Sequence, residues 1–167
     1  MITPTWDLLL SFTLFVFIVF GIVVRKYKIS TLLVALYIAL AVSSEIGLEL
    51  FRLIRKLGWG SDNTDLFTVK FFIFAFLGFL LFIEGEHITS AGDDGSSGLV
   101  QSVIGGLYGL LAGGIVITSI IHFMSAGDQV ALIAKSPIAK TLDGLRIWFL
   151  VPFPFILAFS SLIKRFK

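Results

Sequence analysis

Four ionisable side chains interrupt apolar stretches of the chain and are the first candidates for chemistry: Glu45, Glu49, Lys70 and His122. Ionisable groups at membrane depth often bind ions or relay protons. Glu45 and Glu49 lie one helical turn apart, so their two carboxylates could hold a proton or a cation. The alternative is that both acids reach the membrane interface and pair with Arg52 and Lys56 along the same helix, and we favour this interpretation.

Lys70 and His122 also have structural interpretations. Lys70 lies near the start of its apolar stretch, and we expect its long side chain to carry the ammonium group to the interface. His122 lies near the end of another apolar stretch, where it could relay protons. A single histidine in that position is more often hydrogen-bonded to a neighbour, so neither residue alone predicts a reaction.

The sequence EGEH contains Glu84, Glu86 and His87 and places a carboxylate and an imidazole three residues apart, as in carboxylate metal sites. A di-metal site needs a second such set, and the chain has only two histidines. The sequence also lacks the motifs of serine hydrolases, P-loop proteins, zinc proteases and dinucleotide-binding proteins. Because it has no cysteine either, we expect no metal site, no cofactor, no catalytic residue and no disulfide.

The composition determines which elements must position these side chains. Of the 167 residues, 57% are hydrophobic and 14% are charged, and the mean hydropathy is +1.00. A soluble domain usually carries about 25% charged residues. The chain is therefore predicted to be an all-α membrane protein in contact with the lipid bilayer. Its net charge of +2 does not indicate nucleic acid as a partner.

Four segments are long and apolar enough to cross a membrane: residues 8–24, 29–58, 66–83 and 99–124. The first has no basic n-region and no cleavage site, so we interpret it as a retained span. The second is predicted to be one long helix that becomes amphipathic and stops at Gly58 and Gly60. A polar loop that includes EGEH should follow the third. Residues 1–124 would thus form a four-helix transmembrane unit.

The remainder of the chain divides into two segments. Residues 125–144 are amphipathic and are broken at Pro137, which predicts an interfacial segment. Residues 145–167 are apolar and end in a basic tail, but Pro152 and Pro154 interrupt them. A kinked fifth span and a pair of interfacial helices both fit this pattern, because neighbouring helices can accommodate proline within a membrane.

Small residues recur at four-residue spacing in two of the predicted spans, where they would let two helix backbones approach closely. In the fourth span this series comprises Gly98, Ser102, Gly105, Gly109 and Gly113. In the second span it comprises Ala35, Ala39, Ser43 and Gly47. We predict that these two helices pack together at the centre, with the phenylalanine-rich first and third spans outside. The alternative is that residues 105–114 form the seam of a homodimer.

The order of features over residues 6–142 resembles the colicin V production protein (CvpA) family of small bacterial inner-membrane proteins. The resemblance depends on Trp6-Asp7-Leu8, on the basic turn that leads into Ile29-Ser30-Thr31-Leu32-Leu33, on the glycine series and on Lys135-Ser136-Pro137. The family usually has a glycine in the basic turn, where this chain has Lys26 and Tyr27. An Asp-Arg pair commonly precedes the family's glycine series, and the apolar C-terminal segment here is additional.

The resemblance implies a four-helix inner-membrane protein that serves envelope homeostasis or export of a peptide toxin and has no enzymatic activity. Some relatives carry an extracytoplasmic protease domain after the fourth span, which would place both ends of the unit outside. With four spans, that orientation leaves only Arg25, Lys26 and Lys28 in the cytoplasm and ten basic residues outside, against the positive-inside rule. A fifth span changes the division to six inside and seven outside, so the orientation stays open.

Three functions are consistent with these observations. The first is a non-enzymatic multi-span protein of the colicin V production type that acts through other membrane proteins, with a homo-oligomer as one form of such an assembly. The second is a small oligomeric channel or ion transporter, with the four ionisable residues named above lining its pore. The third is an accessory subunit of a larger membrane complex, which the phenylalanine-rich outer helices would suit.

Overall fold

The computed structural model describes residues 5–24, 26–58, 65–88, 98–152 and 154–155. Nearly all of them belong to seven helices: α1 (Trp6–Val23), α2 (Lys26–Lys56), α3 (Leu66–Ile88), α4 (Gly98–Phe123), α5 (Ala126–Lys135), α6 (Pro137–Gly144) and α7 (Arg146–Leu150). The first four are long and apolar enough to cross a membrane. The protein is therefore an all-α membrane protein, as its composition predicts.

The α2 helix is a single element of 31 residues, as the sequence indicates. It ends where Gly58 takes a positive φ of 68° and its N–H donates to the Arg55 carbonyl at 3.2 Å. The α3 helix differs from expectation, because it continues through Ile88 instead of ending at residue 83. The EGEH sequence is therefore its last helical turns rather than part of a loop.

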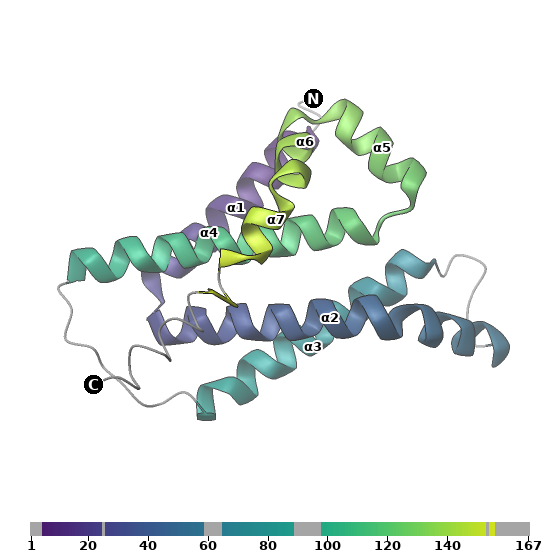
Figure 1. Ribbon diagram of the computed structural model, residues 1–167, viewed down its shortest axis with the longest axis horizontal. Coiled ribbons are helices and arrows are strands. Elements are labelled where there is room, and N and C mark those ends of the chain that lie inside the picture. Colours follow the sequence, from purple (N-terminus) through teal and green to yellow (C-terminus); the bar gives the residue numbers. More distant parts are fainter. Residues whose placement is uncertain (1–4, 25, 59–64, 89–97, 153, 156–167) are drawn as a thin grey trace.

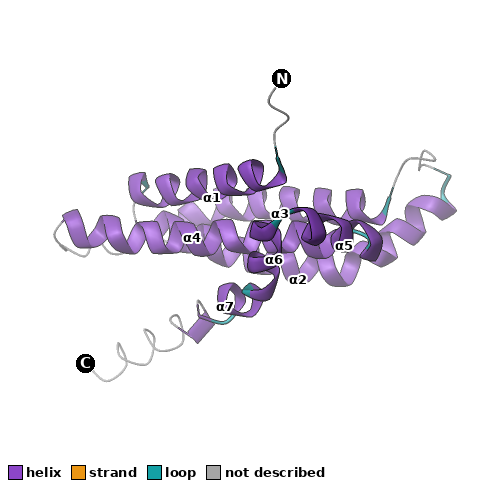
Figure 2. Ribbon diagram, turned by 90° about the horizontal axis from the view of Figure 1, so that it is seen from above, coloured by secondary structure: helices purple, strands orange, loops and turns teal. Residues whose placement is uncertain are grey.

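The four long helices pack in the spatial order α1, α4, α2, α3. Figure 1 shows α1 crossing α4 and α3 crossing α2, and Figure 2 shows α1 and α4 side by side from a second direction. The α4 helix is the most buried of the four spans. It contains Ala112, Ile115 and Ile121, all at most 1% exposed. The second and fourth spans are thus the inner pair, as predicted, but their small residues do not face each other.

The glycines of α4 pack against α1 and not against α2. A Cβ atom placed on Gly109 would overlap the Phe17 carbonyl oxygen and lie 3.0 Å from Ile18 Cα. One on Gly105 would overlap the carbonyl oxygen of Gly21, and one on Gly21 would lie 2.9 Å from Gly109 Cα. The predicted pairing of α4 with α2 through these residues is wrong. The alternative prediction, a homodimer interface formed by these glycines, is also wrong, because α1 already packs against the face of α4 that carries them.

Two small residues of α2, Ala39 and Gly47, lie against α3. The nearest neighbours of a Cβ on Gly78 of α3 would be Leu36 and Ala39 of α2, and a Cβ on Gly47 would lie 2.6 Å from Lys70 Cγ. Ala35, Ala39 and Ser43 are at most 2% exposed. Four-residue spacing marks where a backbone can be approached, but every candidate partner helix is apolar, so the spacing alone cannot select the partner.

The C-terminal helices fold back onto the four-helix unit. Two amphipathic helices, α5 and α6, form a hairpin at the end of the bundle where α1 begins and α4 ends. Ser125 and Ser136 cap them, accepting hydrogen bonds from the Asp128 and Ala139 amides. The short α7 then lies against α4, where the Phe149 ring covers Gly114. The α7 helix therefore lies beside the spans, whereas the basic tail lies outside the described residues.

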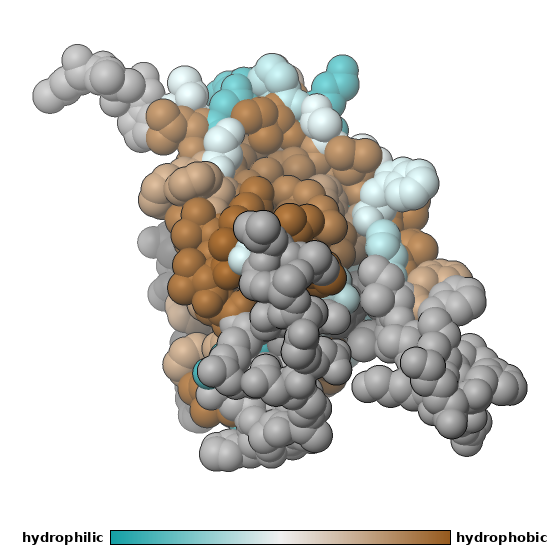
Figure 3. All heavy atoms as spheres, turned by 90° about the vertical axis from the view of Figure 1, so that its left-hand side faces the viewer, coloured by the Kyte–Doolittle hydropathy of each residue, from teal (hydrophilic) through white to brown (hydrophobic). Residues whose placement is uncertain are grey.

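The outer surface matches a protein surrounded by lipid. Large apolar side chains of α1 and α3 are exposed, including Phe12 at 64%, Phe76 at 65% and Phe79 at 68%. On the face that Figure 3 shows, hydrophobic residues cover most of the described surface, and hydrophilic ones gather along the upper edge and at the upper right. Because the bilayer solvates apolar side chains, these faces need no further covering.

Candidate functional site

The α5–α6 hairpin is joined to α1 by a hydrogen-bonded junction between Asp7 and Ser136. The Ser136 hydroxyl, in a residue with no exposed surface, donates to Asp7 Oδ1. The same oxygen accepts from the Ile138 N–H at 3.4 Å, and the Ser136 hydroxyl oxygen accepts from the Ala139 N–H at 3.0 Å. A carboxylate at the first turn of a helix satisfies free N–H groups and opposes the positive end of the helix dipole. Asp7 therefore holds α6 in place.

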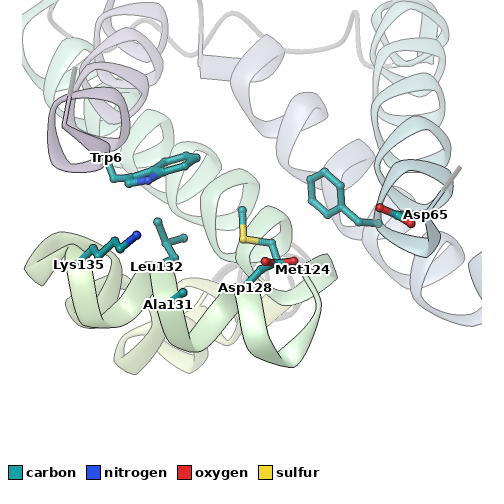
Figure 4. A pocket seen from close by; sticks show the side chains of 8 residues that line it. Trp6, Asp65, Met124, Asp128, Ala131, Leu132 and Lys135 are labelled. Atoms are coloured by element: carbon teal, nitrogen blue, oxygen red, sulfur yellow. The ribbon is translucent and has the colours of Figure 1, made fainter. Parts of the chain in front are cut away.

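A cleft of about 360 Å³ lies beside this junction, between α5 and the starts of α1 and α3. Figure 4 shows its side chains, with Trp6 above Leu132 and Lys135 of α5, and with Asp65 on the opposite wall. The full lining is Trp6, Asp65, Phe67, Met124, Asp128, Ala131, Leu132 and Lys135.

The chemistry of the cleft favours binding over reaction. Its apolar walls come from Trp6, Phe67 and Leu132, while Asp65, Asp128 and Lys135 supply charges of both signs at the rim. Asp128 is engaged locally, because the Ser125 hydroxyl donates to its Oδ2 at 2.7 Å. No group of three or more metal-ligating side chains occurs among the described residues. An amphipathic segment with charged ends would match such a lining.

Glu45 and Glu49 do not form a shared site. Both are exposed on α2, and Glu49 pairs with Arg52 at 2.8 Å, with side-chain exposures of 70% and 64%. The Glu49–Arg52 pair is one of the pairings that the sequence favours, and an exposed pair of this kind contributes only about 0–1 kcal/mol to stability. The pair therefore gives no support to a proton or cation site.

Lys70 and His122 lie near each other at the same end of the bundle. The Lys70 ammonium is 5.9 Å from the centre of the Phe123 ring, and His122 Nδ1 is 3.0 Å from Arg146 Nη1. A hydrogen-bonding neighbour for His122 was expected. The sequence did not indicate that this neighbour is Arg146, because Arg146 follows the two amphipathic helices α5 and α6 in the chain.

Tyr37 connects α2 to the C-terminal segment, a contact that the sequence analysis did not predict. Its hydroxyl lies 3.0 Å from the Phe149 carbonyl oxygen and also bonds the Leu150 carbonyl. Because Pro154 has no N–H, it cannot donate to the Leu150 carbonyl as a helical residue would. Tyr37 supplies that hydrogen bond from α2. The signal in the sequence was the phenol of a lone tyrosine within an apolar span, which needs a polar partner.

The EGEH residues provide no metal site that the structure can describe. Glu84 is exposed at the end of α3. The side chains of Glu86 and His87 lie outside the described residues, as do the surroundings of Gly98. Ser102, the other outer member of the glycine series, lines an apolar groove between α1 and α4 together with Ile18.

Comparison with known proteins yields no relative for this arrangement. No protein-family model, no curated protein and no solved structure matches the chain. The function is therefore argued from the geometry described above, and the family resemblance stays a prediction.

Proposed function

We propose that this chain is a non-enzymatic, multi-span protein of a bacterial inner membrane, of the colicin V production type. In this proposal it acts in envelope homeostasis or peptide export by holding a protein partner at its α5–α6 end. The proposal depends on a contrast between two parts of the molecule. The interior of the four long helices is closely packed, whereas the α5–α6 hairpin is exposed and is attached to α1 by the Asp7–Ser136 hydrogen bond.

The interior supports an anchoring role. Three of its buried hydroxyls are satisfied within their own helices, with Ser43 bonded to the Leu40 carbonyl at 3.1 Å, Thr118 to the Gly114 carbonyl at 2.7 Å and Ser119 to the Ile115 carbonyl at 2.6 Å. No buried side-chain nitrogen or oxygen lacks a partner among the described residues. A water-filled path through a membrane protein is normally lined by polar groups that face it. A packed interior of this kind is more typical of a membrane anchor than of a channel.

The α5–α6 hairpin supports a binding role. Its outer face has a groove formed by Val130, Ile133, Ala134, Pro137 and Lys140. Val130 is 68% exposed although it belongs to an amphipathic helix whose Leu132 is buried. The Asp7–Ser136 junction fixes the hairpin to the bundle, so a partner would meet a preorganised surface, which lowers the entropy cost of binding.

The test uses photocrosslinking amino acids at two equally exposed positions in native membranes. Val130 lies on the hairpin and Phe79 on the lipid-facing side of α3, and both are 68% exposed. We expect a discrete protein adduct at position 130, loss of that adduct in Ser136→Ala, and only lipid adducts at position 79. Recovery of the chain as a partnerless monomer, with no protein adduct at position 130, would overturn the proposal.

The channel alternative has its own test. Purified protein in liposomes should give no flux of protons, sodium or potassium above that of empty liposomes. Flux that disappears in Glu45→Gln or His122→Ala would establish the channel instead. The accessory-subunit alternative would be distinguished by an adduct at position 79, because a permanent complex would cover the phenylalanine-rich faces with protein.

A further inference from the structure

Three basic side chains from three helices gather where the spans end. Lys70 comes from the first turns of α3, His122 from the last turn of α4 and Arg146 from the start of α7. Arg146 contacts His122 at 3.0 Å, and the charges of both Arg146 and Lys70 act on the His122 ring. Asp143 is the acid that also acts on this histidine, and it accepts a hydrogen bond from Gln129 Nε2 at 3.4 Å.

The cluster presents hydrogen-bond donors. A guanidinium group stays protonated and can only donate, so His122 Nδ1 must accept from Arg146. The histidine proton then resides on Nε2, which can donate as well. Within the described residues, neither Lys70 nor Arg146 forms an ion pair with a carboxylate. The cluster therefore carries two full positive charges and an imidazole donor, and Asp143 is the acid whose charge acts on His122.

The position of Lys70 is fixed by its surroundings. Its aliphatic stem crosses Gly47 of α2, where even a methyl group would lie 2.6 Å from Lys70 Cγ. Its ammonium lies over the Phe123 ring, which itself packs edge-on against Phe74 with ring centres 5.8 Å apart. The missing side chain at Gly47 and the ring of Phe123 together direct the charge toward the end of α4, where His122 lies.

We infer that Lys70, His122 and Arg146 bind the phosphate of an anionic phospholipid headgroup. Basic pockets between transmembrane helices recognise such headgroups. The lipid source is favoured because the cluster lies at the ends of the spans and continues into exposed apolar residues of α7. Ile147 is 69% exposed and Trp148 is 71% exposed, and tryptophan is typical of the membrane interface. This inference is independent of the proposed partner function.

The test measures lipid binding to the purified full chain by native mass spectrometry, comparing phosphatidylglycerol with phosphatidylcholine. We expect a preference for phosphatidylglycerol that weakens about fivefold in each of Lys70→Gln and Arg146→Gln, the contribution of one cation near a membrane surface. Lys56→Gln, which removes an exposed charge from the last turn of α2, is the matched control and should keep the full preference. Inorganic phosphate at millimolar concentration should not compete.

Two further variants separate charge from folding. Lys70→Arg and Arg146→Lys keep the positive charge, and both should keep the preference for phosphatidylglycerol. Equal binding of the two lipids by the wild-type chain would overturn the inference, as would the same loss in Lys56→Gln as in Lys70→Gln. Full competition by inorganic phosphate would also overturn it, because the site would then recognise the free anion and not the lipid.

Discussion

Asp7 and Ser136 are separated by 129 positions in the chain, yet the carboxylate of the first accepts a hydrogen bond from the hydroxyl of the second. Both residues belong to sequence motifs that carry the resemblance to the colicin V production family, one at the start of the first span and one at the Lys-Ser-Pro break. The structure thus gives the two motifs a common physical role. They fasten the interfacial hairpin to the membrane-spanning unit.

Asp7→Ala should release this hairpin. We expect α6 docking to lose about 1–2 kcal/mol, since the substitution leaves the Ser136 hydroxyl and the Ile138 N–H without their acceptor. The chain has no native cysteine, so labelling of a cysteine at the fully buried Ala139 reports directly on opening. The labelling rate should rise about five- to thirtyfold.

The control for Asp7→Ala lies in the same helix. The Thr13 hydroxyl makes its hydrogen bond within α1, donating to the Leu9 carbonyl at 2.9 Å. Thr13→Ala should leave the labelling rate unchanged. If Asp7→Ala behaves like Thr13→Ala, the junction does not hold α6.

Gly109→Ala should destabilise the bundle, whereas Gly78→Ala should not. The added methyl group at Gly109 would overlap the Phe17 carbonyl oxygen, and overpacking of this kind costs about 1–3 kcal/mol. At Gly78 the nearest atom, in Leu36, would be 3.7 Å away, an ordinary contact. There the alanine should be neutral or stabilising by up to about 1 kcal/mol, because glycine is the weaker helix former.

Unfolding of the two glycine variants in the same detergent provides the measurement. The structure requires a lower midpoint for Gly109→Ala than for the wild type, and a midpoint for Gly78→Ala at or above it. Equal midpoints for the two variants would contradict the close contact between α1 and α4. The comparison is internal, because both substitutions change glycine to alanine within a membrane-spanning helix.

Tyr37→Phe should loosen the start of the C-terminal segment without disturbing the four long helices. The variant leaves the Leu150 carbonyl without the donor that Pro154 cannot provide, at a cost of about 1–3 kcal/mol. Hydrogen exchange of the peptide that covers α7 should accelerate about tenfold, while exchange in α4 stays at the wild-type rate. Unchanged exchange in α7 would show that the contacts of Phe149 with Gly114 and of Arg146 with His122 hold the segment without Tyr37.

The sequence identified the spans but not how they associate. Apolar windows and helix-ending residues are local, so α2 could be predicted through to Gly58. The contact of Gly109 with α1 depends on Gly21, a single glycine among bulky residues with no repeat to mark it. The bond between Tyr37 and the Leu150 carbonyl depends on how a proline-broken segment folds back. Long-range contacts of this kind leave no periodic trace in one sequence.

The orientation of the protein follows from the same arrangement. Seven of the 13 basic residues lie at the end of the bundle that carries α5 and α6: Arg52, Arg55, Lys56, Lys70, Lys135, Lys140 and Arg146. Three lie in the sequence near the start of α2 and three in the tail beyond residue 155. Whichever side the tail occupies, the α5–α6 end carries the majority of the basic residues. The positive-inside rule therefore predicts that this end is cytoplasmic.

Single cysteines at Ala126 and Glu84 test this orientation, because both positions are exposed and lie at opposite ends of the bundle. In intact cells an impermeant thiol reagent should label the cysteine at 84 and not the one at 126, and permeabilisation should make both reactive. The reverse pattern would place α5 and α6 outside, as the resemblance to relatives with an extracytoplasmic domain implies. A partner for the hairpin would then have to be sought outside the cytoplasm, so this measurement decides which proteins can reach Val130.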